Sequence, residues 1–255
     1  MKSSEVVSLK ALRKMKYSTV LCYPRFKQKE LEKRLKELER LGVQALEFTG
    51  KKNVFDVPVL GKGCVGIVVV AYKNSGRAAL KIRRVDANRK GMFHEGEMLK
   101  RANVVGIGPK LLEISENFLL MELVEGKHFP KWIESLGERE LQSRVQLVLK
   151  DVLEQCYRLD ETGLDHGELS NASKHIIIDA DDNPFLVDFE TASINRRVSN
   201  VTSVCQYLLV GSQISEKVKE KLGRVDEKQL IQKLGKYKRE RTKENFEKLA
   251  KIITK

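Results

Sequence analysis

The chain has 255 residues, of which 41% are hydrophobic and 33% are charged, a composition typical of a folded, soluble protein and not of a disordered one. Its formal net charge is +13, and no apolar run approaches the roughly 20 residues that a membrane-spanning helix needs. The first 16 residues alternate charged and aliphatic side chains without the apolar stretch of a signal peptide, so a cytoplasmic location and no membrane partner are expected.

The positive charge is concentrated at the two ends of the chain. Residues 1–40 contain 12 Lys and Arg against 5 Glu, and residues 233–255 contain 9 against 3, whereas residues 41–232 carry no net charge. Two basic ends predict either an anionic partner such as tRNA or rRNA or a pair of solvated helices. The four cysteines form no C-x-x-C pair, which argues against a disulfide framework or a zinc site.

The first 50 residues are predicted to form a basic N-terminal extension with the order strand, helix, strand. Residues 17–24 have the composition of a short strand. Residues 28–41 predict a helix, because their leucines recur on one stripe and Gly42 provides a stop. Residues 43–48 predict the second strand. The leucine stripe indicates packing against another part of the protein without saying which part.

A glycine-rich segment comes next. Residues 61–66 have the sequence Gly-Lys-Gly-Cys-Val-Gly and lead directly into the β-branched run of residues 67–70. A dinucleotide-binding fold needs a helix after its glycines, whereas four consecutive β-branched residues favour a strand. The phosphate-binding pattern G-x-x-x-x-G-K-[ST] does not occur in the sequence. The segment therefore predicts a hairpin whose glycines let backbone amides lie over phosphates.

The rest of the chain predicts strands early and helices late. This order is typical of an α+β fold with a cleft between unlike halves. The predicted strands cover residues 78–82, 118–123, 176–178 and 185–187, and the predicted helices cover residues 92–104, 142–162 and most of the chain after residue 200.

Lys81 lies at the end of a predicted strand, fifteen residues after Gly66. Considered alone, it would more often face solvent. After this glycine loop it matches the lysine that contacts phosphates in protein kinases and pairs with a helical glutamate. Glu95 and Glu97 both lie on the following predicted helix, and Glu95 is the preferred partner because it shares a face with apolar residues.

With these features the chain resembles the protein-kinase-like superfamily, specifically its small atypical branch. That branch includes the RIO kinases and the kinase subunit of the archaeal and eukaryotic tRNA threonylcarbamoyladenosine-modifying complex. The resemblance covers roughly residues 55–210. Residues 121–126 (Met-Glu-Leu-Val-Glu-Gly) resemble the hinge that receives adenine, and residues 166–173 (His-Gly-Glu-Leu-Ser-Asn-Ala-Ser) resemble the catalytic loop H-G-D-L-x-x-x-N. Residues 188–190 (Asp-Phe-Glu) resemble the metal-binding D-F-G motif.

The resemblance implies a bilobal fold, with a β-rich N-lobe over residues 51–123 and a mainly helical C-lobe over residues 124–255. The activation segment is expected to be short or absent, because no proline follows Pro184. The implied cofactors are ATP and Mg²⁺, with the metal held by Asp188 and Ser173. The residues implied to hold the nucleotide are Gly61, Gly63, Gly66, Val68, Ala79, Lys81, Glu95, Met121, Glu122 and Leu123.

The catalytic loop departs from the family pattern at two positions. Glu168 stands where the family has its catalytic Asp, and Ser173 where it has a metal-binding Asn. The longer side chain moves the carboxylate by about 1 Å, and a misplacement of that size costs roughly 100-fold in rate. Phosphoryl transfer needs little base catalysis, so a slow kinase with Glu168, Lys81 and Asp188 as catalytic residues stays open. Glu168 is also able to ligate the metal, and His166 is expected to brace the loop.

Three functions follow from these observations. The leading one is an atypical ATP- and Mg²⁺-dependent kinase that transfers the γ-phosphate to a serine or threonine of a protein, to itself, or to a small molecule. The alternative is a nucleotide-binding pseudokinase or ATPase switch in an RNA- or ribosome-associated complex. The third is a binding module for tRNA or rRNA, which rests on the two basic ends.

Overall fold

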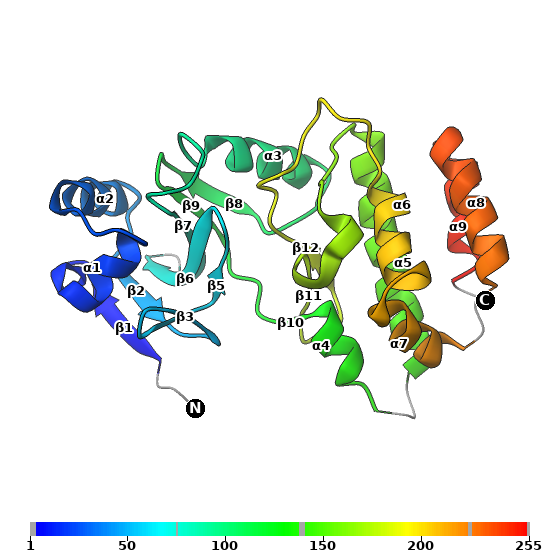
Figure 1. Ribbon diagram of the computed structural model, residues 1–255, viewed down its shortest axis with the longest axis horizontal. Helices are drawn as coiled ribbons and strands as arrows, with labels where there is room; N and C mark the ends of the chain where they lie inside the picture. The colour runs from blue at the N-terminus through cyan, green and yellow to red at the C-terminus, as the bar shows by residue number, and fades with distance from the viewer. Residues whose placement is uncertain (1–3, 75, 138–140, 224–225, 254–255) are drawn as a thin grey trace. The chain divides into compact units, whose positions relative to one another are not determined.

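The computed structural model describes residues 4–74, 76–137, 141–223 and 226–253, and its elements are labelled in Figure 1. Antiparallel strands and helices combine in an α+β fold. The chain divides into two compact units. The first consists of Met1–Glu97 and Lys110–Leu123, and the second consists of Met98–Pro109 and Val124–Lys255. No helix in the described part of the chain is long and apolar enough to cross a membrane.

The first unit is built on one antiparallel sheet with the strand order β1-β2-β6-β7-β9-β8, and β5 pairs with β6 beside this path. The long pair β6 and β7 forms its middle, as expected from the β-branched run that opens β6. The strands are β1 (Glu5–Ser8), β2 (Ala45–Phe48), β5 (Gly61–Lys62), β6 (Gly66–Lys73), β7 (Gly76–Arg83), β8 (Leu111–Ile114) and β9 (Phe118–Glu122). A separate hairpin joins β3 (Lys52–Val54) and β4 (Val57–Val59).

The prediction of a strand over residues 17–24 is wrong. The chain forms a short 3₁₀ turn at Ala11–Arg13 and then helix α1 (Met15–Leu21). Tyr17, Ser18, Val20 and Leu21 are buried, and positions spaced by one, three and four residues lie on one face of a helix and not of a strand. The predicted helix over residues 28–41 is confirmed as α2 (Gln28–Arg40).

The leucine stripe of α2 packs into the core of the first unit, and a buried arginine fixes the helix there. Arg34 is fully buried. Its guanidinium donates hydrogen bonds to the backbone carbonyls of Leu21 (2.5 Å) and Arg83 (2.6 Å) and to Oδ1 of Asn117 (3.1 Å). These three acceptors belong to α1, to β7 and to the turn between β8 and β9. One side chain therefore joins the N-terminal segment to the sheet that carries Lys81.

The second unit is mainly helical. Helix α3 (Phe93–Val104) begins in the first unit and ends in the second. The other helices are α4 (Phe129–Glu134), α5 (Leu141–Glu161), α6 (Asn200–Cys205), α7 (Gln213–Leu222), α8 (Glu227–Arg239) and α9 (Lys243–Ala250), with a 3₁₀ segment at Leu169–Lys174 and a π-helical turn at Gln206–Val210. Three short strands, β10 (Lys127–His128), β11 (Ile176–Ile178) and β12 (Pro184–Leu186), form a small antiparallel sheet. The loop before β11 and the residues after β12 carry the acidic residues discussed below.

Candidate functional site

The glycine segment forms the predicted hairpin in the first unit. Gly61 pairs with Val68 across β5 and β6, and the N–H of Gly63 donates to the carbonyl of Gly66 (2.8 Å). The tip is also held from β7, because Arg84 Nη1 donates to the carbonyl of Gly63 (3.0 Å). Gly63 and Cys64 are exposed at the tip, but the N–H and the carbonyl of Gly63 are both already hydrogen-bonded.

Gly66 provides space for a neighbouring side chain. A Cβ atom at this position would lie 2.9 Å from Cγ and 3.1 Å from Cε of Lys81. Such distances are shorter than ordinary carbon–carbon contacts. The absence of a side chain at Gly66 therefore sets the path that the aliphatic stem of Lys81 follows across the sheet.

Lys81 ends in a buried ion pair. Its Nζ donates to Oε1 of Glu95 at 2.8 Å, and the side chains of the two residues are 6% and 4% exposed. Glu97, the alternative that the sequence left open, is exposed. A buried ion pair contributes little net stability, because desolvation of both charges offsets their attraction. Net stability therefore gives little account of this pair, which lies in the same sheet as the glycine-rich hairpin.

The residues expected around adenine lie on adjacent strands of the same sheet. Ala79 of β7 pairs with Met121 of β9, and Ala79 is buried while Met121 is half-buried. Val68 of β6 is half-buried and pairs with Lys81. The N–H of Glu122 donates to the carbonyl of Lys110 (2.9 Å), so this backbone donor is already used within the first unit. If Glu122 contacts adenine through its backbone, it can do so only as a hydrogen-bond acceptor, through its carbonyl.

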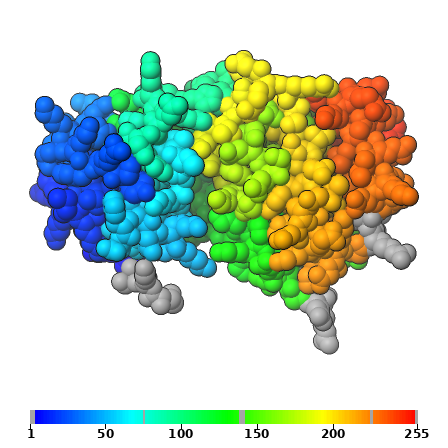
Figure 2. Space-filling model, in the orientation of Figure 1, coloured from blue at the N-terminus to red at the C-terminus, as the bar shows by residue number. Residues whose placement is uncertain are grey.

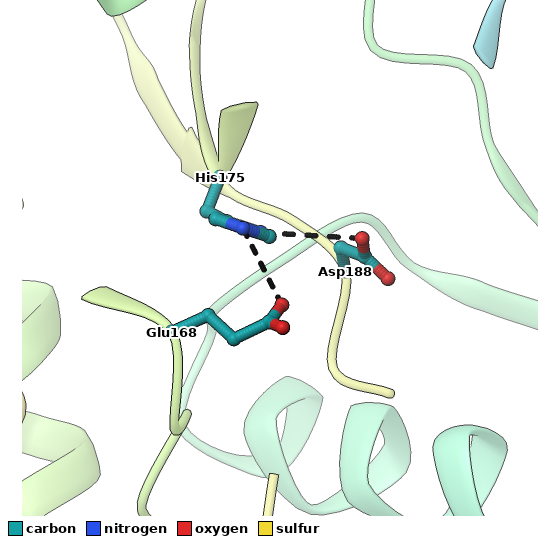
Figure 3. Close-up of side chains that lie close together, drawn as sticks. All are labelled: Glu168, His175 and Asp188. Atoms are coloured by element: carbon teal, nitrogen blue, oxygen red, sulfur yellow. Dashed lines mark ion pairs between the residues drawn. The ribbon is translucent and has the colours of Figure 1, made fainter. Parts of the chain in front are cut away.

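The second unit brings together a histidine and two carboxylates (Figure 3). His175 Nε2 lies 3.3 Å from Oε2 of Glu168, and His175 Nδ1 lies 4.0 Å from Oδ2 of Asp188. One donor atom from each of the three residues lies within 4.8 Å of the others. Figure 3 shows the imidazole with a carboxylate toward each of its two sides.

These residues fit a divalent cation. Donor atoms that share an ion at about 2.1 Å lie at most about 4.2 Å apart, so small side-chain rotations would close the cluster around one. His175 is 9% exposed, and its buried Nδ1 makes no hydrogen bond within the described part of the chain. Buried polar atoms are nearly always paired, and 4.0 Å to Asp188 is too long for a hydrogen bond. A metal ion would give this nitrogen a partner.

The backbone at Asp188 has a positive φ of 72°. Residues other than glycine seldom adopt this conformation, although Asp and Asn tolerate it best. Asp188 follows strand β12 and does not lie in a tight turn like that of Asp182, which also has a positive φ. Unusual backbone conformations of this kind concentrate at functional sites.

Ser173, which the resemblance assigns to the metal, lies in the 3₁₀ segment two residues before His175. Its hydroxyl donates to Oδ1 of Asn171 (3.1 Å) within the 3₁₀ segment. The histidine two residues later lies beside the two carboxylates. The family pattern H-G-D-L-x-x-x-N ends at residue 173 and therefore gives no indication of His175. The one sequence signal is that His175 directly precedes the buried strand β11, and this signal does not place it beside the carboxylates.

His166 braces the loop, as the sequence predicts. It is fully buried, its Nε2 lies 3.1 Å from the carbonyl of Val187, and its ring lies 4.9 Å from the ring of Phe189. Burial lowers the pKa of His166 to about 4, so the imidazole is neutral at pH 7. Its position therefore supports the backbone on either side of Asp188.

A chain of hydrogen bonds extends this support to α8. The N–H of His166 donates to Oδ1 of Asn200 (2.8 Å), whose Nδ2 donates to Asp160 (2.9 Å). Asp160 also accepts from the hydroxyl of Tyr237 at 3.0 Å. These residues are buried. Helix α8, which carries Tyr237, is thereby linked to the loop that carries Glu168.

A comparison of the chain with models of known protein families finds no match, and a comparison with curated proteins finds no relative. A functional assignment therefore rests on the chemistry of the residues described above.

Proposed function

We propose that the chain is an atypical ATP- and Mg²⁺-dependent kinase with a bilobal, protein-kinase-like fold, and that its acceptor is a serine or threonine hydroxyl. The observation that carries the proposal is the buried pair of Lys81 and Glu95, with Gly66 of the glycine-rich hairpin packed on the lysine stem. Kinases combine these three features to hold ATP phosphates. A structural hairpin has no need of a buried lysine–glutamate pair.

Each group has a defined task in this proposal. The exposed backbone at Cys64, at the tip of the hairpin, and the ammonium of Lys81 hold the phosphates, while Glu95 fixes the position of that ammonium. Glu168, His175 and Asp188 would hold a divalent cation, which supplies positive charge against the charge of the phosphates. The apolar positions Val68, Ala79 and Met121 would contact adenine.

Transfer requires one bond to form and one to break. The acceptor hydroxyl oxygen bonds to the γ-phosphorus as the bond to the β–γ bridging oxygen breaks, and ADP leaves. The hydroxyl proton passes to the carboxylate oxygen of Glu168 that does not ligate the cation. Because the transition state is loose, this base contributes little compared with positioning and charge. We therefore expect a slow enzyme.

One observation favours the alternative function. The carboxylate of Glu168 lies 3.3 Å from His175, and a carboxylate engaged in this way is less available to accept a proton. A protein that binds ATP and changes state without transferring phosphate, as a pseudokinase or ATPase switch, would tolerate this arrangement.

Transfer of label from γ-labelled ATP tests the proposal and separates the two functions. Wild-type protein with Mg²⁺ is expected to label a generic protein substrate or itself, and Asp188→Asn to reduce the rate by at least tenfold. The exposed turn variant Asp181→Asn is the control and should behave as wild type. Absence of labelling by wild type, together with retained ATP binding, would reject the kinase and support the switch.

A further inference from the structure

We infer that His175 makes the cluster with Glu168 and Asp188 a binding site for a first-row transition-metal dication, which it holds more tightly than Mg²⁺ and without nucleotide. The inference rests on the proposed function only because both use the cluster of Glu168, His175 and Asp188. It concerns the identity of the metal, which the resemblance to kinases gives as Mg²⁺.

The argument begins with the donor set. Mg²⁺ prefers oxygen ligands and retains several waters. An imidazole nitrogen instead suits transition-metal dications, whose affinity for a mixed nitrogen and oxygen site rises from Mn²⁺ towards Cu²⁺. Glu168 and Asp188 supply oxygen, and His175 supplies a nitrogen within 4.8 Å of both. One nitrogen and two carboxylates therefore shift preference away from Mg²⁺.

The second step is the state of the imidazole. Nδ1 of His175 is buried and makes no hydrogen bond within the described residues. Nδ1 of the bracing residue His166 is also buried and unpaired, so an unpaired nitrogen does not by itself indicate a metal. His175 differs from His166 because carboxylate oxygens of Glu168 and Asp188 lie 3.3 and 4.0 Å from its two ring nitrogens. Nδ1 of His175 lies 4.0 Å from Oδ2 of Asp188, and Figure 3 marks this ion pair with a dashed line. Coordination of an ion by Nδ1 would satisfy the nitrogen and bring the two side chains together.

The third step is the rigidity of the support. His175 directly precedes strand β11, and its own N–H donates to the carbonyl of Ala172 while its carbonyl accepts from the N–H of Val187 (3.0 Å each). The histidine backbone is therefore fixed against the segment that leads to Asp188. A site held in this way is pre-organised, and binding without nucleotide is expected.

Mn²⁺ alone is the probe. Full-length protein without nucleotide is titrated with Mn²⁺ by electron paramagnetic resonance, and Mg²⁺ is added in competition. Wild type is expected to bind one Mn²⁺ at least tenfold more tightly than Mg²⁺, with spin-echo modulation from a directly bound ¹⁴N. His175→Asn substitutes an amide oxygen for the imidazole. The substitution should abolish the ¹⁴N modulation and weaken the affinity for Mn²⁺ at least tenfold, while the affinity for Mg²⁺ should change less than threefold.

The matched control is His94→Asn, which removes an exposed histidine of α3 and should leave both affinities and the modulation unchanged. Wild type containing ¹⁵N-histidine provides a test without any substitution, since the ¹⁴N modulation should disappear. Mn²⁺ binding without nitrogen modulation, or a His175→Asn variant with unchanged Mn²⁺ affinity, would overturn the inference. A protein that binds Mn²⁺ but not ATP would contradict the proposed function alone. A protein that binds ATP with Mg²⁺ but no free Mn²⁺ would contradict this inference alone.

Discussion

Gly66 leaves the space through which Lys81 reaches Glu95. Because a Cβ atom would approach the lysine stem to 2.9 Å, Gly66→Ala should displace Nζ from Oε1 of Glu95 and destabilise the protein by about 1–3 kcal/mol through overpacking. ATP binding should weaken by at least tenfold. Calorimetric unfolding and ATP titration measure the two effects.

Gly61 provides the comparison for this substitution, since a Cβ there would lie an ordinary 3.4 Å from Val68. Gly61→Ala is expected to cost less than about 1 kcal/mol, as volume changes that fit their surroundings do. Equal destabilisation by the two substitutions would contradict the claim that Gly66 positions the lysine.

The residues of the site differ in how far the sequence could identify them. Lys81 and Glu95 could be paired because helical periodicity places Glu95 on the inner face of its helix. The location of His175 beside two carboxylates could not be obtained from the sequence, because it depends on the 3₁₀ path of the loop and on the positive φ of Asp188. Loop geometry of that kind leaves no periodic pattern.

At the scale of elements, the hydrogen bonds of Arg34 hold helix α2 against α1 and the sheet of the first unit. Replacement by Leu would leave the carbonyls of Leu21 and Arg83 without this donor, and each unsatisfied buried group costs about 1–3 kcal/mol. We expect Arg34→Leu to lower the free energy of unfolding by more than about 3 kcal/mol, measured by urea unfolding with circular dichroism.

The neighbouring residue supplies the control for Arg34. Lys33 pairs with Glu116 on the surface, where both side chains are more than 40% exposed, and pairs of this kind contribute about 0–1 kcal/mol. Lys33→Leu should therefore change stability little. If Lys33→Leu and Arg34→Leu destabilised the protein equally, the fastening role of Arg34 would be disproved.

Helices α5 and α6 carry buried groups that predict an alkaline loss of stability. Burial raises the pKa of Cys156 and Cys205 above the ordinary value of 9.0, and burial together with a hydrogen bond to Glu161 raises the pKa of Tyr157 to about 12. The folded state thus retains protons that the unfolded state loses. The stability that these groups contribute is complete below pH 9 and is lost as pH rises towards their folded-state pKa values.

Trp132, the only tryptophan, lies in the second unit, and its fluorescence can follow the loss of stability with pH. The free energy of unfolding should fall above pH 9, by up to about 1.4 kcal/mol per pH unit for each group. Cys205→Ala removes one of these groups, so the free energy of unfolding should fall less steeply with pH, by the contribution of one thiol. An unchanged steepness in this variant would contradict the assignment.

Elements with strong periodicity were predictable, and those set by tertiary packing were not. The leucine stripe of α2 and the β-branched start of β6 identified both elements from the sequence. Residues 17–24 were predicted as a strand because aromatic and β-branched residues favour strands, yet the packing of Tyr17 and Leu21 in the core of the first unit imposes a helix. Short segments follow their surroundings more than their composition.

At the scale of the whole molecule, the uneven charge provides a test for RNA. Lys236, Lys238 and Arg239 of α8 are exposed, and the C-terminal helices, orange to red in Figure 2, lie open on the face shown. If they contact phosphates, the logarithm of RNA affinity should fall linearly with the logarithm of salt concentration. Replacing all three residues by Gln should reduce the slope by about 3. If RNA does not bind, or binds with an affinity independent of salt, the basic ends are solvated helices and not an RNA-binding surface.

The central claim is that the glycine hairpin and Lys81 bind ATP and that Asp188 provides its dependence on metal. Thermal unfolding with and without ATP and Mg²⁺ tests it most directly, because a ligand at 100 times its Kd stabilises the folded state by about 2.7 kcal/mol. The variants are Lys81→Met combined with Glu95→Met, which removes both buried charges, and Asp188→Asn, which tolerates the positive φ. Asp181→Asn is the control.

Wild type and the control should be stabilised by ATP with Mg²⁺. The double variant should fold, but ATP should not raise its unfolding temperature. ATP should raise the unfolding temperature of Asp188→Asn by the same amount with and without Mg²⁺. Absence of stabilisation in wild type, or an undiminished response in the double variant, would contradict the claim.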